Sequence, residues 1–113
     1  RICAGEHGLS QKEKLDVLPT PEEVRGRSPG YRRAARSIGF HSQAAGFFAD
    51  FHGVARPLFI FNLSGEVEYE LGDGSTLKIS PGDGILFEDT TDPGHTTRVI
   101  GNSPRHAATV ALE

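Results

Sequence analysis

A two-residue alternation of polar and apolar side chains constrains this chain more than any other feature of its sequence. The alternation is complete over residues 65–71, GEVEYEL, where glutamates alternate with Val67, Tyr69 and Leu71. Successive side chains of a β-strand point to opposite faces, so these glutamates should face water while the three apolar residues face a core. From Ser37 onward, similar short patterns recur between turns about every eight to ten residues, which predicts an all-β domain.

Turn residues divide this part of the chain into short strands. The segments 63–65, 72–74 and 81–84 are rich in Gly, Pro, Asp and Ser, the residues that favour tight turns. Strands are expected near Ser37–His41, Gly46–His52, Pro57–Leu63, Glu66–Leu71, Leu77–Ile79, Ile85–Phe87, Thr96–Ile100 and His106–Leu112. No helical period interrupts them, so the chain should close as a sandwich or a small antiparallel β-barrel.

Residues 57–63 depart from the common pattern in which one face of a strand is polar and exposed to solvent. Leu58 and Ile60 share one face, while Phe59, Phe61 and Leu63 form the other, so both faces are apolar. A strand that is covered on both sides needs a second layer of protein. In a chain of 113 residues, we expect that cover to be a partner subunit or the N-terminal part of the chain.

Residues 1–36 are interpreted as an N-terminal arm in front of a β-barrel domain of residues 37–113. The arm is polar, and its TPEE sequence at residues 20–23 combines an N-cap Thr, a first-turn Pro and acidic residues. This combination predicts a short helix that ends near Gly26. The arginines between Arg25 and Arg36 lack an aromatic stacking pattern, so a solvated or subunit-contacting segment is favoured over nucleic-acid binding.

Charge and cysteine content limit the classes of partner and the compartment. The formal net charge of -3 gives no general attraction to nucleic acid or to a membrane surface. Cys3 is the single cysteine, which excludes an intramolecular disulfide and a cysteine-based zinc site and favours a reducing compartment. No apolar run approaches the roughly 18 residues of a spanning helix, and the first residues lack a signal-peptide layout. A cytoplasmic location is therefore expected.

Residues 46–112 resemble the cupin superfamily, and in particular its small single-domain members. The resemblance rests on LSGEVE at residues 63–68, the Asp73-Gly74 pair, PGD at residues 81–83 before an apolar strand, and EDTT at residues 88–91 leading to Gly94-His95. It implies a small antiparallel β-barrel of jelly-roll type with a pocket inside, usually assembled as a homodimer. Because cupins include oxygenases, isomerases, cyclases, storage proteins and sensors, the fold does not decide the function.

The resemblance carries over only part of the metal site that is typical of cupins. Members of the superfamily hold a divalent metal with two histidines and a glutamate from a first motif and one histidine from a second. Here His52 matches the first histidine, whereas Val54 and Leu58 stand at the positions of the second histidine and the glutamate. Gly94-His95 matches the end of the second motif. The first metal-binding motif is therefore degenerate.

Two interpretations of the site stay open. In one, Asp50 joins His52 on the same face of its strand and both meet His95, giving a two-histidine, one-carboxylate set for iron, zinc, manganese or nickel. In the other, which is slightly favoured, Asp50 is an exposed strand charge and the two histidines line a pocket without a metal, hydrogen-bonded to each other or to water. Histidines that bind a ligand or act as acid and base without a metal fit either interpretation. Either pocket should be lined by the side chains of Val54, Leu58, Ile60 and Thr97.

Other polar residues are weaker candidates. His41 is a less favoured addition to the pocket, from a neighbouring strand, and His106 is expected at the surface. Glu88, Asp89 and Asp92 lack the regular spacing of a calcium loop and are assigned to turns and hydrogen bonds. The expected function is therefore a cupin-like protein of unassigned activity that binds a small molecule inside the barrel, with or without metal-dependent catalysis. A metal-free, non-catalytic sensor or binding module is the alternative, and an interaction scaffold without a ligand is a third.

Overall fold

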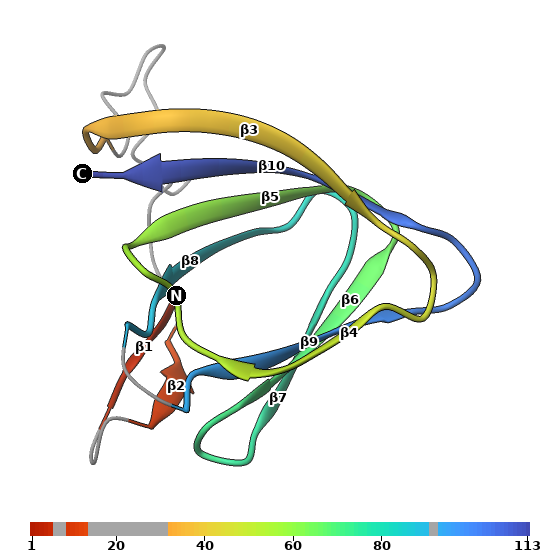
Figure 1. Ribbon diagram of the computed structural model, residues 1–113, viewed down its shortest axis with the longest axis horizontal. Helices are drawn as coiled ribbons and strands as arrows, with labels where there is room; N and C mark the ends of the chain where they lie inside the picture. The colour runs from red at the N-terminus through yellow and green to blue at the C-terminus, as the bar shows by residue number, and fades with distance from the viewer. Residues whose placement is uncertain (6–8, 14–31, 91–92) are drawn as a thin grey trace, which may run out of the picture.

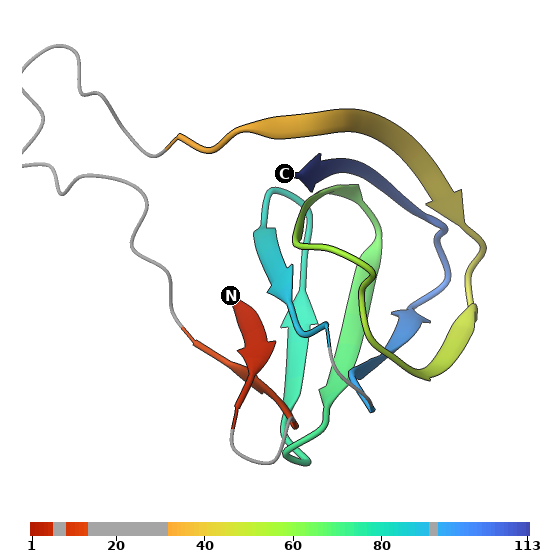
Figure 2. The ribbon, with the colours of Figure 1, turned by 60° about the vertical axis from the view of Figure 1, so that its left-hand side comes forward.

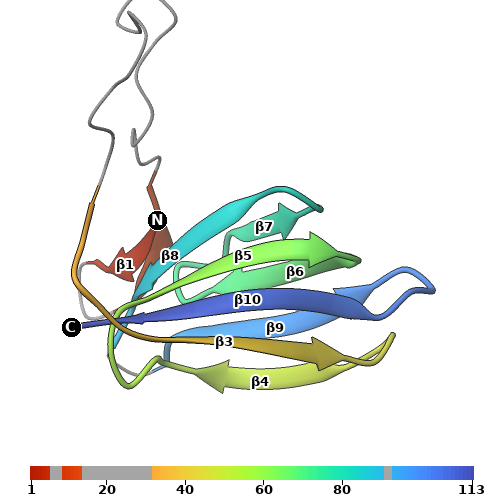
Figure 3. The same cartoon turned by 90° about the horizontal axis from the view of Figure 1, so that it is seen from above.

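The computed structural model describes residues 1–5, 9–13, 32–90 and 93–113, and these residues form two β-sheets that face each other (Figure 1). The larger sheet has the strand order β2-β1-β8-β5-β10-β3, and the smaller sheet has the order β4-β9-β6-β7. Figure 3 shows β8, β5, β10 and β3 side by side in front of the smaller sheet. The strands are β1 (Ile2–Ala4), β2 (Ser10–Lys12), β3 (Ala35–Gln43), β4 (Phe48–His52), β5 (Leu58–Ser64), β6 (Glu66–Leu71), β7 (Thr76–Ile79), β8 (Gly84–Glu88), β9 (His95–Ile100) and β10 (Arg105–Leu112).

The prediction of an all-β domain is confirmed, and β3 to β10 match the eight expected strands. The prediction of a closed barrel is wrong, because the edge strands β2 and β3 of the larger sheet form no ladder with the edge strands β4 and β7 of the smaller one. The sheets stay separate because the chain passes from one to the other in the turn after β3, where the Phe47 N–H donates to the Ala44 carbonyl at 3.1 Å. The next strand, β4, pairs with β9 in the smaller sheet and not with β3.

The apolar core lies between the sheets and follows the predicted alternation of β6. Val67, Tyr69 and Leu71 are at most 1% exposed, while the glutamates between them face outward. They pack with Ile2, Ile79, Ile85 and Phe87 from β1, β7 and β8. Burial of this apolar surface is the main favourable term in the stability of the two-sheet arrangement.

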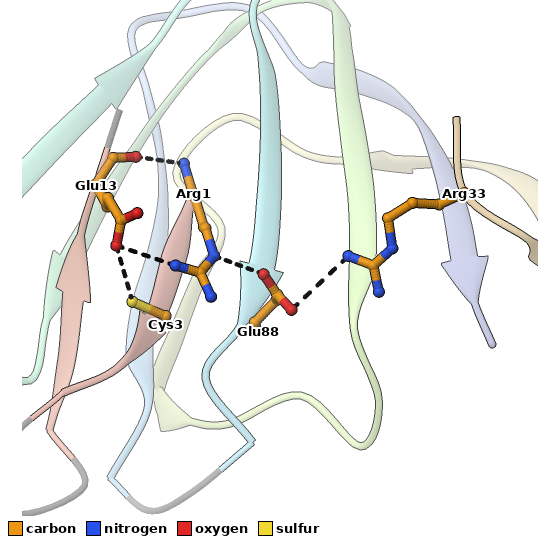
Figure 4. A network of polar contacts seen from close by, with 5 residues as sticks. All are labelled: Arg1, Cys3, Glu13, Arg33 and Glu88. Atoms are coloured by element: carbon orange, nitrogen blue, oxygen red, sulfur yellow. Dashed lines mark hydrogen bonds and ion pairs between the residues drawn. The ribbon is translucent and has the colours of Figure 1, made fainter. Parts of the chain in front are cut away.

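The first residues of the chain contribute two short strands that the sequence analysis missed. Ile2 is fully buried in the core and Cys3 is 8% exposed, and β1 pairs in parallel with β8. Figure 2 shows the β1–β2 pair, in red, beside β8 and away from β3. Arg1 Nε lies 2.6 Å from Glu88 Oε1, and Arg1 Nη1 lies 3.0 Å from Glu13 Oε2, which ties the pair to β8 (Figure 4).

The structure tests only some of the expectations for the N-terminal arm. The helix predicted from Thr20 to Gly26 lies outside the described residues. Cys3, expected in a polar arm, is instead part of the larger sheet because its neighbour Ile2 anchors the strand in the core. The boundary between the arm and the domain at residue 36 stays a prediction. Among the described residues, no helix is long and apolar enough to cross a membrane.

The outer face of the larger sheet is apolar, as predicted from residues 57–63. Ile38 and Phe40 on β3 are 64% and 74% exposed, and Phe61 and Leu63 on β5 are 44% and 55% exposed. Phe59 lies on the same face, with its ring stacked 5.8 Å from that of Phe61. Contact of this face with a second subunit stays a prediction.

Candidate functional site

A cavity of about 280 Å³ opens between the two sheets, beside the core. Two core side chains, Tyr69 and Phe87, also form part of its wall, with their rings 5.1 Å apart edge to face. The cavity therefore begins where the apolar core ends. Its wall contains polar and apolar side chains from both sheets and from the segment after β4: His41, Gln43, His52, Val54, Ala55, Leu58, Ile60, Tyr69, Phe87, His95, Thr97 and Arg105.

His95, at the start of β9, is a buried polar group in this wall. It is 3% exposed, and its Nδ1 lies 2.6 Å from Oδ2 of Asp89, which is fully buried. The imidazole stacks on Phe87 at 4.4 Å and meets the edge of Tyr69 at 5.7 Å. When Asp89 is ionised, Nδ1 carries the proton that it donates to the carboxylate, and Nε2 is left as the acceptor.

Asp89 forms hydrogen bonds, as expected, but the sequence analysis did not identify His95 as its partner. The EDTT segment indicated a turn, and Asp89 does accept the Val54 N–H through its backbone carbonyl at 3.1 Å. Its side chain, however, turns inward to His95, and its second oxygen, Oδ1, is buried without a hydrogen-bond partner among the described residues. Asp89 precedes His95 by six positions and the two residues do not share a strand, so no strand or helix period would reveal their contact.

Gly94 allows the backbone of β4 to approach β9 beside His95. Its φ is +72°, and a Cβ at this position would collide with the carbonyl of His52 and the amide of Gly53. Only glycine adopts this backbone conformation without strain and leaves room for that approach. As a result, His52 pairs directly with His95, and the two imidazole rings lie 4.7 Å apart.

The structure separates Asp50 from the two histidines. Asp50 is exposed and outside the cavity, where its Oδ1 accepts the Phe51 N–H at 2.8 Å and its carbonyl lies 2.7 Å from His52 Nδ1. The expectation that Asp50 and His52 share a face assumed an unbroken strand. The ladder of β4 with β9 shifts register between Ala49 and His52, so the two-residue period does not hold there.

The remaining predicted pocket residues do meet in space. Val54, Leu58, Ile60 and Thr97 all line the cavity together with the two histidines, and His41 joins them from β3. Burial, reinforced by the charge of Arg105, lowers the pKa of His41 below its ordinary value. His106 is exposed, as expected, with Nδ1 2.6 Å from the Ser42 hydroxyl.

The donor set does not fit the metal site that the resemblance implied. Within the ranges that the structure describes, no cluster of three or more His, Cys, Asp or Glu side chains is placed to hold a metal ion. The Asp50 carboxylate accepts the Phe51 N–H and does not line the cavity, and Asp89 is in contact with His95 Nδ1, so no described residue provides His52 and His95 with a third ligand of the expected kind. Metal binding stays a prediction.

Arg105 is a cavity residue for which the sequence analysis gave no role. It opens β10, is 1% exposed, and donates through Nε to Asn62 Oδ1 at 3.0 Å and through Nη2 to the Tyr69 hydroxyl at 2.7 Å. Burial raises the pKa of Tyr69, and the neighbouring guanidinium opposes that rise. The two-residue period of a strand could have indicated this position, because Arg105 lies two positions before Ala107, which faces inward on the same strand.

Comparison with known proteins identifies the fold. No family model and no curated protein matches the chain. An uncharacterised protein with a double-stranded β-helix domain from Klebsiella pneumoniae matches with a TM-score of 0.55 and 18% identity, over 88% of this chain and 90% of that one. A cupin superfamily protein from Desulfitobacterium hafniense matches with a TM-score of 0.52 and 16% identity, over 88% and 98%.

An enzyme is also similar in fold. The DMSP lyase DddQ from Ruegeria pomeroyi matches with a TM-score of 0.54 and 18% identity over 67% of this chain, which spans only 37% of that enzyme. At such identities the likeness concerns the fold alone. Together with the other structural neighbours, it establishes that this chain has the cupin fold, also called a double-stranded β-helix.

Proposed function

We propose that this cupin-fold chain binds a small organic molecule in the cavity between its sheets and exchanges a proton with it through His95. The observation that carries the proposal is the buried contact at 2.6 Å between Asp89 and His95, whose imidazole lines the cavity. A buried carboxylate beside an imidazole has one common chemical effect. It fixes the tautomer, so that the other ring nitrogen is the hydrogen-bond acceptor.

The surroundings of His95 favour a directed base. Stacking on Phe87 and the contact with Tyr69 restrict rotation of the ring, and the bond to Asp89 fixes which nitrogen is protonated. Nε2 is therefore the nitrogen that would accept a proton from a bound molecule. His52, with its ring 4.7 Å from that of His95, is a second group that would return a proton or hold the ligand.

The cavity limits the size and character of the ligand. A volume of about 280 Å³ lies at the lower limit of the roughly 300–1,000 Å³ that is usual for small-molecule sites. Val54, Leu58 and Ile60 provide an apolar wall, while the histidines supply a few polar groups. A small molecule with an apolar part fits this combination.

A binding measurement that also counts protons tests the proposal. Calorimetry of a panel of small acids, amides and ketones, repeated in buffers of different ionisation enthalpy, gives both the affinity and the protons exchanged on binding. We expect a ligand whose binding changes the proton count in the wild type and no longer does so in His95→Gln. His106→Gln, which changes an exposed histidine outside the cavity, should behave as the wild type.

Each outcome has a defined meaning. Binding with no proton exchange, unaffected by His95→Gln, would refute the acid–base role and leave the non-catalytic binding module. Absence of binding for the whole panel would overturn the proposal. Asp89→Asn offers a further check, because nitrogen NMR of the wild type should show the His95 tautomer protonated at Nδ1 and the variant should lose that preference.

A further inference from the structure

We propose that the molecule bound in the cavity is a small monocarboxylate, whose charged group pairs with Arg105. This inference rests on the proposed function, because it names the chemical class of the ligand of the same cavity. It starts from a buried cation. Arg105 is 1% exposed, and within the described ranges no Asp or Glu side chain forms an ion pair with it.

The partners of the Arg105 guanidinium are all neutral. Its Nε donates to Asn62 at 3.0 Å, Nη1 to Gln43 at 3.2 Å and Nη2 to Tyr69 at 2.7 Å. These hydrogen bonds satisfy three donors but leave the charge without a counter-ion among the described residues. Since a buried charge is strongly unfavourable unless it is paired, an anionic partner would stabilise this group substantially.

Two donors of Arg105 are available for such a partner. A guanidinium has five N–H groups, and the terminal nitrogens Nη1 and Nη2 each carry two. With one protein acceptor apiece, each terminal nitrogen keeps one N–H that no described residue accepts. A planar carboxylate matches paired guanidinium donors well, which is why arginine is the usual residue for recognition of this group.

The guanidinium is held in place before any ligand binds. Asn62 is 2% exposed, and its Nδ2 donates to the Gly65 carbonyl at 2.7 Å, which turns its Oδ1 toward Arg105. The other two acceptors come from β3 and β6, so three strands fix one side chain. Preorganisation of this kind reduces the entropy lost on binding.

The charges of the wall favour a single negative group. Arg105 lines the cavity, and none of the described lining residues is acidic. Asp89 is in contact with His95 and does not line the cavity. One unpaired cation beside an apolar wall of Val54, Leu58, Ile60 and Phe87 suits one carboxylate on a small apolar body better than a doubly charged phosphate.

Matched pairs of ligands separate this inference from a purely structural role of Arg105. Calorimetry would compare butyrate with butyramide and benzoate with benzamide, because each pair differs mainly in charge. We expect the wild type to bind at least one carboxylate about tenfold or more tightly than its amide, as for hydrogen bonds to a charged group. Arg105→Gln should abolish that preference, and Arg98→Gln, which removes an exposed arginine stacked on Phe48, should retain it.

The outcomes distinguish this inference from the proposed function. Equal or tighter binding of the amides would overturn the carboxylate assignment while leaving a small-molecule cavity intact. Carboxylate binding that depends on Arg105 but exchanges no proton would support the assignment and refute the acid–base role of His95. Binding of neither member of any pair would overturn the assignment.

A second measurement does not depend on the folding of the Arg105 variant. In the wild type, the side-chain N–H signals of Arg105 should shift on addition of the tighter carboxylate and remain unchanged with its amide. Unchanged signals at saturating carboxylate would overturn the inference.

Discussion

Replacement of Gly94 by alanine tests how the two histidines of the cavity are brought together. Gly94 has a φ of +72°, and a methyl group there would meet the backbone of His52 and Gly53. The left-handed conformation costs a non-glycine residue about 1–3 kcal/mol. Displacement of a packed neighbour costs about 1–3 kcal/mol more, so Gly94→Ala should lower the free energy of unfolding by about 2–6 kcal/mol.

Gly74→Ala is the matched control. Gly74 has a similar φ of +87°, but a Cβ at that position has no atom within 4 Å. The control should therefore show the conformational cost alone, about 1–3 kcal/mol. Urea denaturation of both variants and the wild type gives the two losses, and their difference isolates the contact with the β4 backbone.

The comparison also has a functional part. The backbone of β4 can relieve the contact with the added methyl group by moving away from β9, which would separate the imidazoles that now lie 4.7 Å apart. Ligand affinity should fall in Gly94→Ala and not in Gly74→Ala. Equal losses of stability in the two variants would refute the reasoning, because they would mean that the close approach at Gly94 has no energetic consequence.

Three further predictions concern pH, the Arg105 network and assembly. The pKa of His41 is lowered in the folded state, so the folded protein should lose stability as the pH falls below 6.5, the ordinary pKa of histidine. Denaturation at a series of pH values should show a smaller loss of unfolding free energy in His41→Gln than in the wild type. Tyr69→Phe removes an acceptor of Arg105, so it should lower the free energy of unfolding by about 1.5–3 kcal/mol in urea denaturation, and a loss near zero would contradict the network. If the exposed face around Phe40 and Phe61 meets a second copy, sedimentation should give a dimer for the wild type and a monomer for Phe40→Ser; a wild-type monomer at micromolar concentration would refute it.

The strands could be predicted because they depend on local order, and the cupin fold could be predicted because short turn motifs resemble those of a known superfamily. The alternation over Val67, Tyr69 and Leu71 and the turns around it repeat at the period of a strand, and each strand needs only its own residues to be recognised. The segment β1 lacked such a signal. It has three residues, and its place beside β8 depends on the burial of Ile2 in a core built by distant strands.

The residue pattern predicted strands whose side chains alternate between a core and solvent, and the resemblance to cupins implied that His52 and His95 face the same interior. The chemistry of that interior depends on the tertiary structure. A register shift in β4 leaves Asp50 outside the cavity, the Asp89 side chain turns to His95, and the pairing of β10 places Arg105 among neutral groups. Asp50 and Arg105 are placed by pairing between strands that lie far apart in the chain, and a two-residue period carries no information about which strands become neighbours.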